Sequence, residues 1–148
     1  MLQNGSRTVQ GNVNRLKGNV VKKNHTQAIH ILLLGEDLAQ NKILLSNLHK
    51  IENFQVQAPS NSTRFLNKRH AVHFDIVILE MEEPLDDSLN RLKKIRQTNP
   101  GAKVIITNSG DANDAVAKAF SYGAIDFFPK PLEVDLLSER IHSLLTVN

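Results

Sequence analysis

The stretch Phe74–Pro84, which reads FDIVILEMEEP, decides the fold that the sequence predicts. At its centre, four apolar residues, Ile76–Leu79, are followed at once by the acidic Glu80. A run of this kind is too short for a helix and is typical of a strand that is buried on both faces of a parallel sheet. Glu80 is then either the first solvated residue after the strand or part of a site, because open α/β sheets carry their sites at the carboxyl ends of strands.

The segments on both sides of this stretch alternate between short apolar runs and helical patterns. We expect further strands at 29–34, 54–58, 103–107 and 125–128, and helices at 38–51, 63–72, 88–98, 111–122 and 132–145. Such alternation predicts a parallel sheet with right-handed crossovers. The expected fold is a flavodoxin-like, doubly wound (βα)5 domain with strand order 2-1-3-4-5 and a crevice at the ends of the first and third strands.

Two helix boundaries follow from local signals. Asp86 and Asp87 are expected to cap the third helix, whose inner face would include Lys93 beside Leu89, Leu92 and Ile95. Gly123 is expected to end the fourth helix, because glycine readily adopts the left-handed backbone conformation found after helix ends.

Length and composition exclude several classes of protein. A chain of 148 residues suits one domain of ordinary size. The absence of cysteine excludes disulfides, zinc–thiolate sites and cysteine nucleophiles. No apolar run approaches the roughly 20 residues of a membrane span, and the amino terminus lacks the apolar core of a secretory signal. A cytoplasmic location is therefore expected.

Residues 1–28 differ in charge from the rest of the chain. They include five basic residues and no acidic one, whereas the remainder has 13 basic and 15 acidic residues. The segment is rich in polar residues and is expected to be a disordered tail, with the domain covering residues 29–146. The tail is either a solvated leader or a contact for an anionic partner such as nucleic acid or a membrane surface.

Polar side chains gather where the predicted strands end. The set comprises Glu36, Asp37, Glu80, Thr107, Asn108 and Lys130. Glu36, Asp37 and Glu80, together with Glu82, form a predicted acidic pocket and possible metal site. Clustered carboxylates repel one another and favour either a bound cation or a salt-bridged lysine. A surface loop in which Lys130 pairs with a neighbouring acid is the simpler alternative. No nucleotide-binding motif, nucleophile or substrate pocket is apparent, so no enzymatic activity is expected.

These segments resemble the response-regulator receiver domains of two-component signalling, and the resemblance runs from Ile29 to about Leu145. The segment DIVILEMEEP is similar to the family pattern D-[LI]-[VI]-[LI]-[LM]-D-x-x-M-P, with Pro84 in register. The segment GDANDAVAKAFSYGAIDFFPKPL resembles the family's fourth helix, fifth strand and Lys-Pro signature.

The resemblance implies a role for several residues. Glu80 takes the position of the phosphoacceptor aspartate, and Lys130 that of the lysine that contacts the phosphoryl group. Glu36 takes the second of the paired acidic positions that hold magnesium, and Gly35 takes the first. Thr107 or Asn108 falls at the switch hydroxyl: ungapped alignment from Lys130-Pro131 puts Asn108 there and Thr107 one residue earlier. Phe127 falls at the aromatic of the fifth strand.

Three of these positions depart from the family pattern. Glu80 is one methylene longer than aspartate, which moves its carboxylate by roughly 1 Å and works against in-line attack. Its permanent negative charge toward Lys130 would imitate a phosphorylated state. Gly35 removes one carboxylate, so any Mg²⁺ would bind more weakly. Asn108 has no hydroxyl to follow a phosphoryl group.

The resemblance therefore implies an atypical receiver, or pseudo-receiver, that acts in signalling as a phosphorylation-independent interaction module. The partner is expected to be a protein, which could be a second copy of the chain. The expected docking surface is formed by the fourth helix, fifth strand and fifth helix, and it includes Ala115, Lys118, Ala119, Tyr122 and Phe127. Alternatively, Glu80, Glu82 or Glu83 is phosphorylated with the help of a divalent cation and controls an output domain or a partner such as a transcription regulator.

Overall fold

Five parallel strands form one sheet in the computed structural model, which describes residues 27–35, 38–68, 73–108 and 113–146. The strands are β1 (Ile29–Leu34), β2 (Phe54–Gln57), β3 (Ile76–Glu80), β4 (Lys103–Asn108) and β5 (Ala124–Pro129). Their order is β2-β1-β3-β4-β5, and every neighbouring pair is parallel. The predicted fold class and strand order are therefore confirmed. Residues 1–26 of the predicted tail lie outside the described residues.

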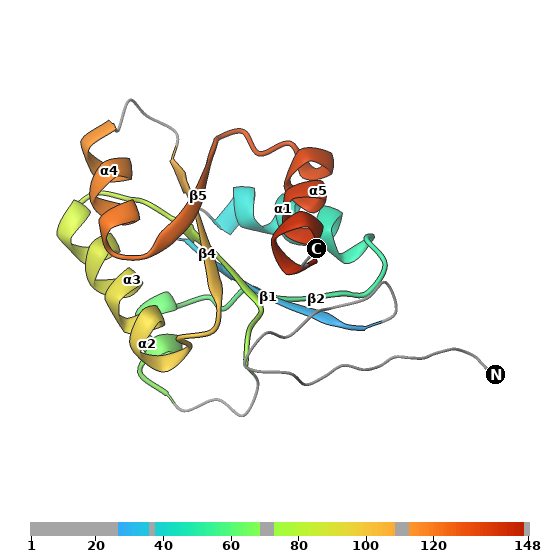
Figure 1. The fold of residues 1–148 in the computed structure, drawn as a ribbon, viewed down its shortest axis with the longest axis horizontal. Coiled ribbons are helices and arrows are strands. Elements are labelled where there is room, and N and C mark those ends of the chain that lie inside the picture. Colours follow the sequence, from blue (N-terminus) through green and yellow to red (C-terminus); the bar gives the residue numbers. More distant parts are fainter. Residues whose placement is uncertain (1–26, 36–37, 69–72, 109–112, 147–148) are drawn as a thin grey trace.

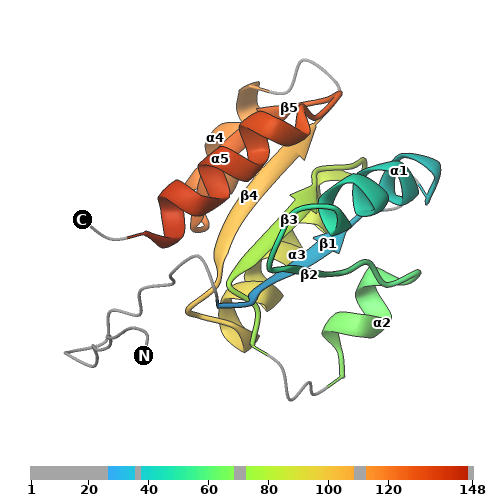
Figure 2. The same cartoon turned by 90° about the vertical axis from the view of Figure 1, so that its right-hand side faces the viewer.

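Helices cover both faces of the sheet. They are α1 (Leu38–His49), α2 (Ser62–Leu66), α3 (Leu85–Thr98), α4 (Asn113–Ser121) and α5 (Val134–Leu145). Figure 1 shows α1 and α5 on one side of the sheet and α2, α3 and α4 on the other, and Figure 2 gives a second view of the same arrangement. We call these sides the α1/α5 face and the α3/α4 face. Within the described ranges, no helix is long and apolar enough to cross a bilayer.

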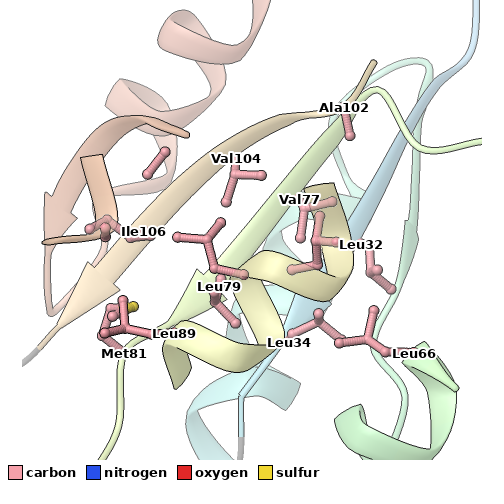
Figure 3. Close-up of a cluster of buried hydrophobic side chains, with 14 of the residues drawn as sticks. Leu32, Leu34, Leu66, Val77, Leu79, Met81, Leu89, Ala102, Val104 and Ile106 are labelled. Atoms are coloured by element: carbon pink, nitrogen blue, oxygen red, sulfur yellow. The ribbon is translucent and has the colours of Figure 1, made fainter. Parts of the chain in front are cut away.

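The central strand β3 is buried along its whole length, as its apolar run predicts. Successive side chains of a strand point to opposite faces. Ile76 and Ile78 accordingly pack with residues of α1 and α5, whereas Val77 and Leu79 pack with residues of α3. Figure 3 shows the cluster on the α3/α4 face, where Val77 and Leu79 lie among Leu34, Leu89 and other apolar side chains. The sheet thus has a separate core on each side.

The end of α2 and the start of α3 differ from the sequence prediction. Asn61 caps α2 by accepting a hydrogen bond from the Arg64 N–H, and the helix ends at Leu66, short of the predicted Val72. Residues 69–72 lie outside the described part. Pro84, and neither Asp86 nor Asp87, is the N-cap residue of α3, and the two aspartates lie in its first turn. Their charges there are favourable, because the first turn of a helix carries partial positive charge.

Lys93 does not lie on the inner face of α3, so that prediction was wrong. Its side chain is exposed, and its ammonium lies 4.9 Å from the centre of the Tyr122 ring. A cation over an aromatic face is a favourable electrostatic contact that leaves the charge near solvent. The inner face of α3 is formed by Ser88, Leu89, Leu92 and Ile95.

Gly123 follows α4 with a φ of 106°, as expected for the residue after a helix end. A Cβ at this position would lie 2.9 Å from Nε of Arg96. The Arg96 side chain is held in place, because its Nη1 donates a 2.9 Å hydrogen bond to the Ala102 carbonyl. Both the backbone conformation and the available space therefore favour glycine.

We predict that Gly123→Ala lowers the free energy of unfolding by about 1–2 kcal/mol, because alanine is strained at this φ. Gly101→Ala is the matched control, since a Cβ at that position has nothing within 4 Å, and it should change stability by about 0.5 kcal/mol or less. Urea denaturation measures both. Equal effects of the two substitutions would contradict this account.

We also predict that Leu92→Ala costs about 2–5 kcal/mol, because it leaves a cavity in the core on the α3/α4 face. Leu92 is 0% exposed, whereas Leu136 on α5 is 55% exposed. The same substitution at Leu136 should therefore have a small effect. Thermal unfolding of the two variants tests this, and a comparable loss at Leu136 would show that the burial is assigned wrongly.

Candidate functional site

Glu80, Thr107 and Lys130 meet at the carboxyl edge of the sheet. Glu80 ends β3 and lies beside Thr107 of β4 in the strand register. Lys130 follows β5, and its backbone N–H donates a 3.1 Å hydrogen bond to the carbonyl of Asn108. From this position its ammonium forms an ion pair with Oε2 of Glu80. The fold therefore joins residues that are 50 positions apart in the sequence.

The ion pair between Glu80 and Lys130 is largely shielded from solvent. The two side chains are 11% and 13% exposed, respectively. Burying a single charge is costly, and a partner of opposite charge offsets that cost. Removing either side chain would leave the other charge with little solvation, so each residue holds the other in place.

Hydrogen bonds fix the loop that follows Glu80. The backbone N–H of Met81 donates to the Thr107 carbonyl at 2.8 Å, and the Asn108 side-chain amide donates to the Met81 carbonyl at 3.0 Å. The Ser88 hydroxyl accepts a hydrogen bond from the Glu82 N–H at 2.8 Å and donates one to the Glu82 carbonyl at 3.0 Å. The loop is thereby tied to both β4 and α3. Sequence reasoning missed Ser88, although a serine near a helix start is a common hydrogen-bonding residue.

The predicted acidic pocket is described only in part. Glu36 and Asp37 lie outside the described residues. Glu82 pairs with Arg91 of α3, with Nη1 and Oε1 3.3 Å apart. Within the described ranges, no group of three His, Asp or Glu side chains is placed to hold a metal. Since Mg²⁺ prefers an octahedral set of oxygen ligands, the described residues do not by themselves fit a magnesium site.

The neighbours Thr107 and Asn108 point to opposite faces of the sheet. Thr107 is two residues after Ile105, which packs on the α1/α5 face, so its side chain points to that face. Asn108 is two residues after Ile106, which packs on the α3/α4 face, so its side chain points to the opposite face. Glu80 also points to the α1/α5 face, because it is two residues after Ile78, which packs there. The Thr107 hydroxyl and Oε1 of Glu80 are both buried, and in the described part of the chain neither has a hydrogen-bond partner.

Only some of the residues predicted for the docking surface are accessible. Lys118 and Tyr122 are exposed, and Ala115 is half-buried. Phe127 is also half-buried and packs against the core on the α3/α4 face. Ala119 is 0% exposed, so its assignment to a surface was wrong. Alanine occurs on both sides of this helix, with Ala117 exposed and Ala119 buried, so the residue type alone does not identify the inward positions.

Sequence reasoning missed other groups on this part of the molecule. Besides the predicted Tyr122, exposed large apolar side chains occur on α4, β5 and α5, namely Phe120, Ile125 and Leu136. An ion pair between Asp126 of β5 and Arg140 of α5, with Oδ2 and Nε 2.5 Å apart, links two of these elements. These two residues are 14 positions apart in the sequence, and the pattern of exposed residues at the end of a strand does not indicate which residue of the following helix will pair with it.

Comparison with known proteins places the chain in a family. The family model for the response regulator receiver domain matches residues 31–142. Response regulator ArlR from Staphylococcus aureus is 33% identical over 94 residues, which are 64% of this chain and 42% of that protein. The chain thus spans less than half the length of this relative.

Solved structures show the same fold. A CheY-like receiver domain protein from Methanospirillum hungatei JF-1 superimposes with a TM-score of 0.71 at 21% identity, covering 80% of this chain and 94% of that one. A response regulator from Burkholderia pseudomallei, solved with a phosphorylated aspartic acid, a calcium ion and citrate, gives a TM-score of 0.67 at 16% identity over 76% of this chain and 66% of that one. The family match, the sheet order and the meeting of Glu80 with Lys130 agree, and this chain belongs to the response regulator receiver domain family.

Proposed function

We propose that this receiver domain acts as a protein-interaction module whose site is held in one state by Glu80, without phosphorylation of an aspartate. The observation that carries this proposal is the ion pair between Glu80 and Lys130. In the family that this chain resembles, the lysine at the position of Lys130 contacts the phosphoryl group. Here its charge is already neutralised by a carboxylate of the same chain.

The chemistry of Glu80 supports this proposal. The structurally similar protein from Burkholderia pseudomallei carries a phosphorylated aspartic acid, whereas the family resemblance puts the glutamate Glu80 at the phosphoacceptor position of this chain. The added methylene displaces the carboxylate by roughly 1 Å, and such displacements strongly reduce the rates of oriented reactions. A fixed negative charge beside Lys130 would reproduce part of the electrostatic effect of a phosphoryl group.

The residue at the switch position gives a second line of support. The Asn108 amide donates a hydrogen bond to the Met81 carbonyl, so the side chain is already engaged with the loop after β3. A threonine or serine hydroxyl at this position would be able to rotate toward a phosphoryl oxygen. The asparagine instead connects β4 to the loop in the state described here.

The partner surface would be formed by α4, β5 and α5. Aromatic and large apolar residues are enriched in the buried centres of protein interfaces. The exposed residues Phe120, Tyr122, Ile125 and Leu136 provide such groups. The partner that this surface would accept most simply is a second copy of the chain, because most oligomers of soluble proteins are symmetric.

A phospho-regulated receiver is the second candidate. The observation that favours it is Oε1 of Glu80, which is not bound to Lys130 or to any other group within the described residues. Transfer of a phosphoryl group to this oxygen would require a divalent cation and a donor. Of the other acidic residues in the loop, Glu82 is paired with Arg91 and Glu83 is exposed.

We predict that Mg²⁺ and beryllofluoride leave the amide NMR spectrum of the wild-type domain unchanged, because the glutamate and its ion pair occupy the position of the phosphoryl mimic. The double variant Gly35→Asp/Glu80→Asp restores two acidic positions of the family pattern and serves as the responsive control. Its signals near Phe127 and α5 should shift on addition of both reagents. Shifts of the wild-type protein that spread from Glu80 to α5 would contradict the proposal and favour the phospho-regulated candidate.

We predict that the domain self-associates through α4, β5 and α5. Ile125→Asp should weaken a dimer at least tenfold, because it would place a charge at the centre of the proposed apolar contact. Ile43→Asp on α1 is the matched control, since Ile43 is also exposed but lies on a different helix. Sedimentation equilibrium over a range of concentrations measures both. A wild-type protein that stays monomeric, or a dimer that Ile43→Asp disrupts equally, would show that this surface is not a dimer contact.

A further inference from the structure

The sequence that forms α2 and α3 carries an excess of positive charge. Residues 53–74 and 88–110 contain no acidic residue. Because α2 packs beside α3 (Figure 1), the two segments contribute to one surface. Residues 69–72 lie outside the described part but belong to the first segment, so they add no negative charge. The basic residues of the two segments are Arg64, Lys68, Arg69, Arg91, Lys93, Lys94, Arg96 and Lys103.

A pocket of about 350 Å³ lies between the two helices, and we call it the α2/α3 pocket. The residues of α3 that line it are spaced by three, four and seven positions, which is the spacing of one helix face. The lining residues are Asp87, Asn90, Arg91 and Lys94 of α3, together with Thr63, Leu66 and Asn67 from α2 and its C-cap. Apart from Leu66 and Asp87, these side chains are cations or can donate hydrogen bonds.

Three cations at this pocket can accept an anionic partner. Lys94 lines the pocket, and Arg64 and Lys68 directly follow the lining residues Thr63 and Asn67 in the sequence. None of the three forms an ion pair with another described residue, whereas Arg91 is paired with Glu82. An anion at the α2/α3 pocket therefore meets positive charge that no described carboxylate neutralises.

The negative charge of Asp87 lies at one end of the pocket. Asp87 is in the first turn of α3, and its distance from Lys94 is about 10 Å along the helix axis. The acids outside the described part, at positions 36, 37 and 111, closely follow the carboxyl ends of β1 and β4 in the sequence. Because α3 begins after the carboxyl end of β3 and ends before the amino end of β4, Lys94 lies toward the opposite edge of the sheet.

The α2/α3 surface lacks the apolar groups that other kinds of partner require. Protein interfaces are enriched in aromatic residues and depleted of lysine at their centres, and helices that bind membranes insert an apolar face. Among the described residues, the exposed large apolar side chains are Ile43, Phe120, Tyr122, Ile125 and Leu136, and none of them belongs to α2 or α3. The surface therefore favours a partner that is bound by charge and hydrogen bonds.

The donors on this surface fit phosphate groups better than carboxylates. A carboxylate is bound most strongly by an arginine that presents two parallel N–H groups, but the arginine in the pocket, Arg91, is already paired with Glu82. Lysine binds phosphate as a point charge. In nucleic-acid complexes, phosphates are contacted by lysine and arginine together with threonine and asparagine, and these are the residue types present here.

We propose that the α2/α3 surface binds the phosphate backbone of a nucleic acid without reading its sequence. Arg64, Lys68 and Lys94 would pair with phosphates, and Thr63 and Asn90 would donate hydrogen bonds to phosphate oxygens. The inference is independent of the proposed interaction function, because it uses a surface other than the one formed by α4, β5 and α5.

The test is fluorescence anisotropy of a short labelled DNA duplex titrated with the full chain. A dissociation constant on the order of 100 µM is expected at physiological salt, with binding that weakens steeply as salt is added. Two duplexes of unrelated sequence should bind equally. A polyglutamate peptide of matched charge and vesicles of anionic lipid should bind at least tenfold more weakly than DNA.

Matched variants locate the binding surface. Lys68→Glu/Lys94→Glu should weaken binding at least tenfold and reduce the slope of log Kd against log salt by about 2, because two phosphate contacts are lost. Lys42→Glu/Lys50→Glu is the control: it makes the same change in charge at exposed positions on and just after α1, and should weaken binding by about threefold or less. Residues 1–28 are the same in all variants, so their contribution to binding does not affect the comparison.

Asp87→Asn provides a test that loss of folding cannot imitate. Removing this carboxylate from the pocket should tighten DNA binding about twofold to threefold. The proposal is overturned if Asp87→Asn has no effect, or if the two double variants, shown to be folded by their amide spectra, weaken binding equally. Equal or tighter binding of polyglutamate or of the vesicles would assign the surface to a different partner and also overturn it.

Discussion

The structure of the site depends on the ion pair between Glu80 and Lys130. It connects the end of the central strand to the segment after the edge strand β5, across the end of β4. Because both side chains are about nine-tenths buried, breaking the ion pair would leave a poorly solvated charge without its partner. The positions of Thr107, Asn108 and the β5–α5 segment are consequently fixed relative to β3.

Successive side chains of β4 point to opposite faces of the sheet, so the surroundings of this ion pair differ between the α1/α5 face and the α3/α4 face. Asn108 on the α3/α4 face binds the loop after Glu80, and Thr107 on the α1/α5 face lies beside Glu80 in the wall of a small pocket. One oxygen of the Glu80 carboxylate forms the internal ion pair, and the other, Oε1, is buried without a hydrogen-bond partner within the described residues.

Much of the fold could be predicted from local patterns, whereas several side-chain contacts could not. The unbroken apolar run of β3 and the glycine after α4 each have one plausible structure, and the strand order then brings Glu80 to Lys130. The N-terminus of α3 was ambiguous, because Pro84, Asp86 and Asp87 are all acceptable near a helix start. The burial of Ala119 and the exposure of Lys93 depend on how α3 and α4 are rotated against the sheet. The pairing of Asp126 with Arg140 and the pocket between α1 and α5 arise only from packing.

A double-mutant cycle across Glu80 and Lys130 tests the central claim most directly. The free energy of unfolding would be measured by urea denaturation for the wild type, Glu80→Gln, Lys130→Met and the double variant. If the ion pair holds the site, each single substitution destabilises the domain, and the double variant loses less than the sum of the two, with a coupling energy of at least about 1 kcal/mol. Additive losses, with a coupling energy near zero, would contradict the account.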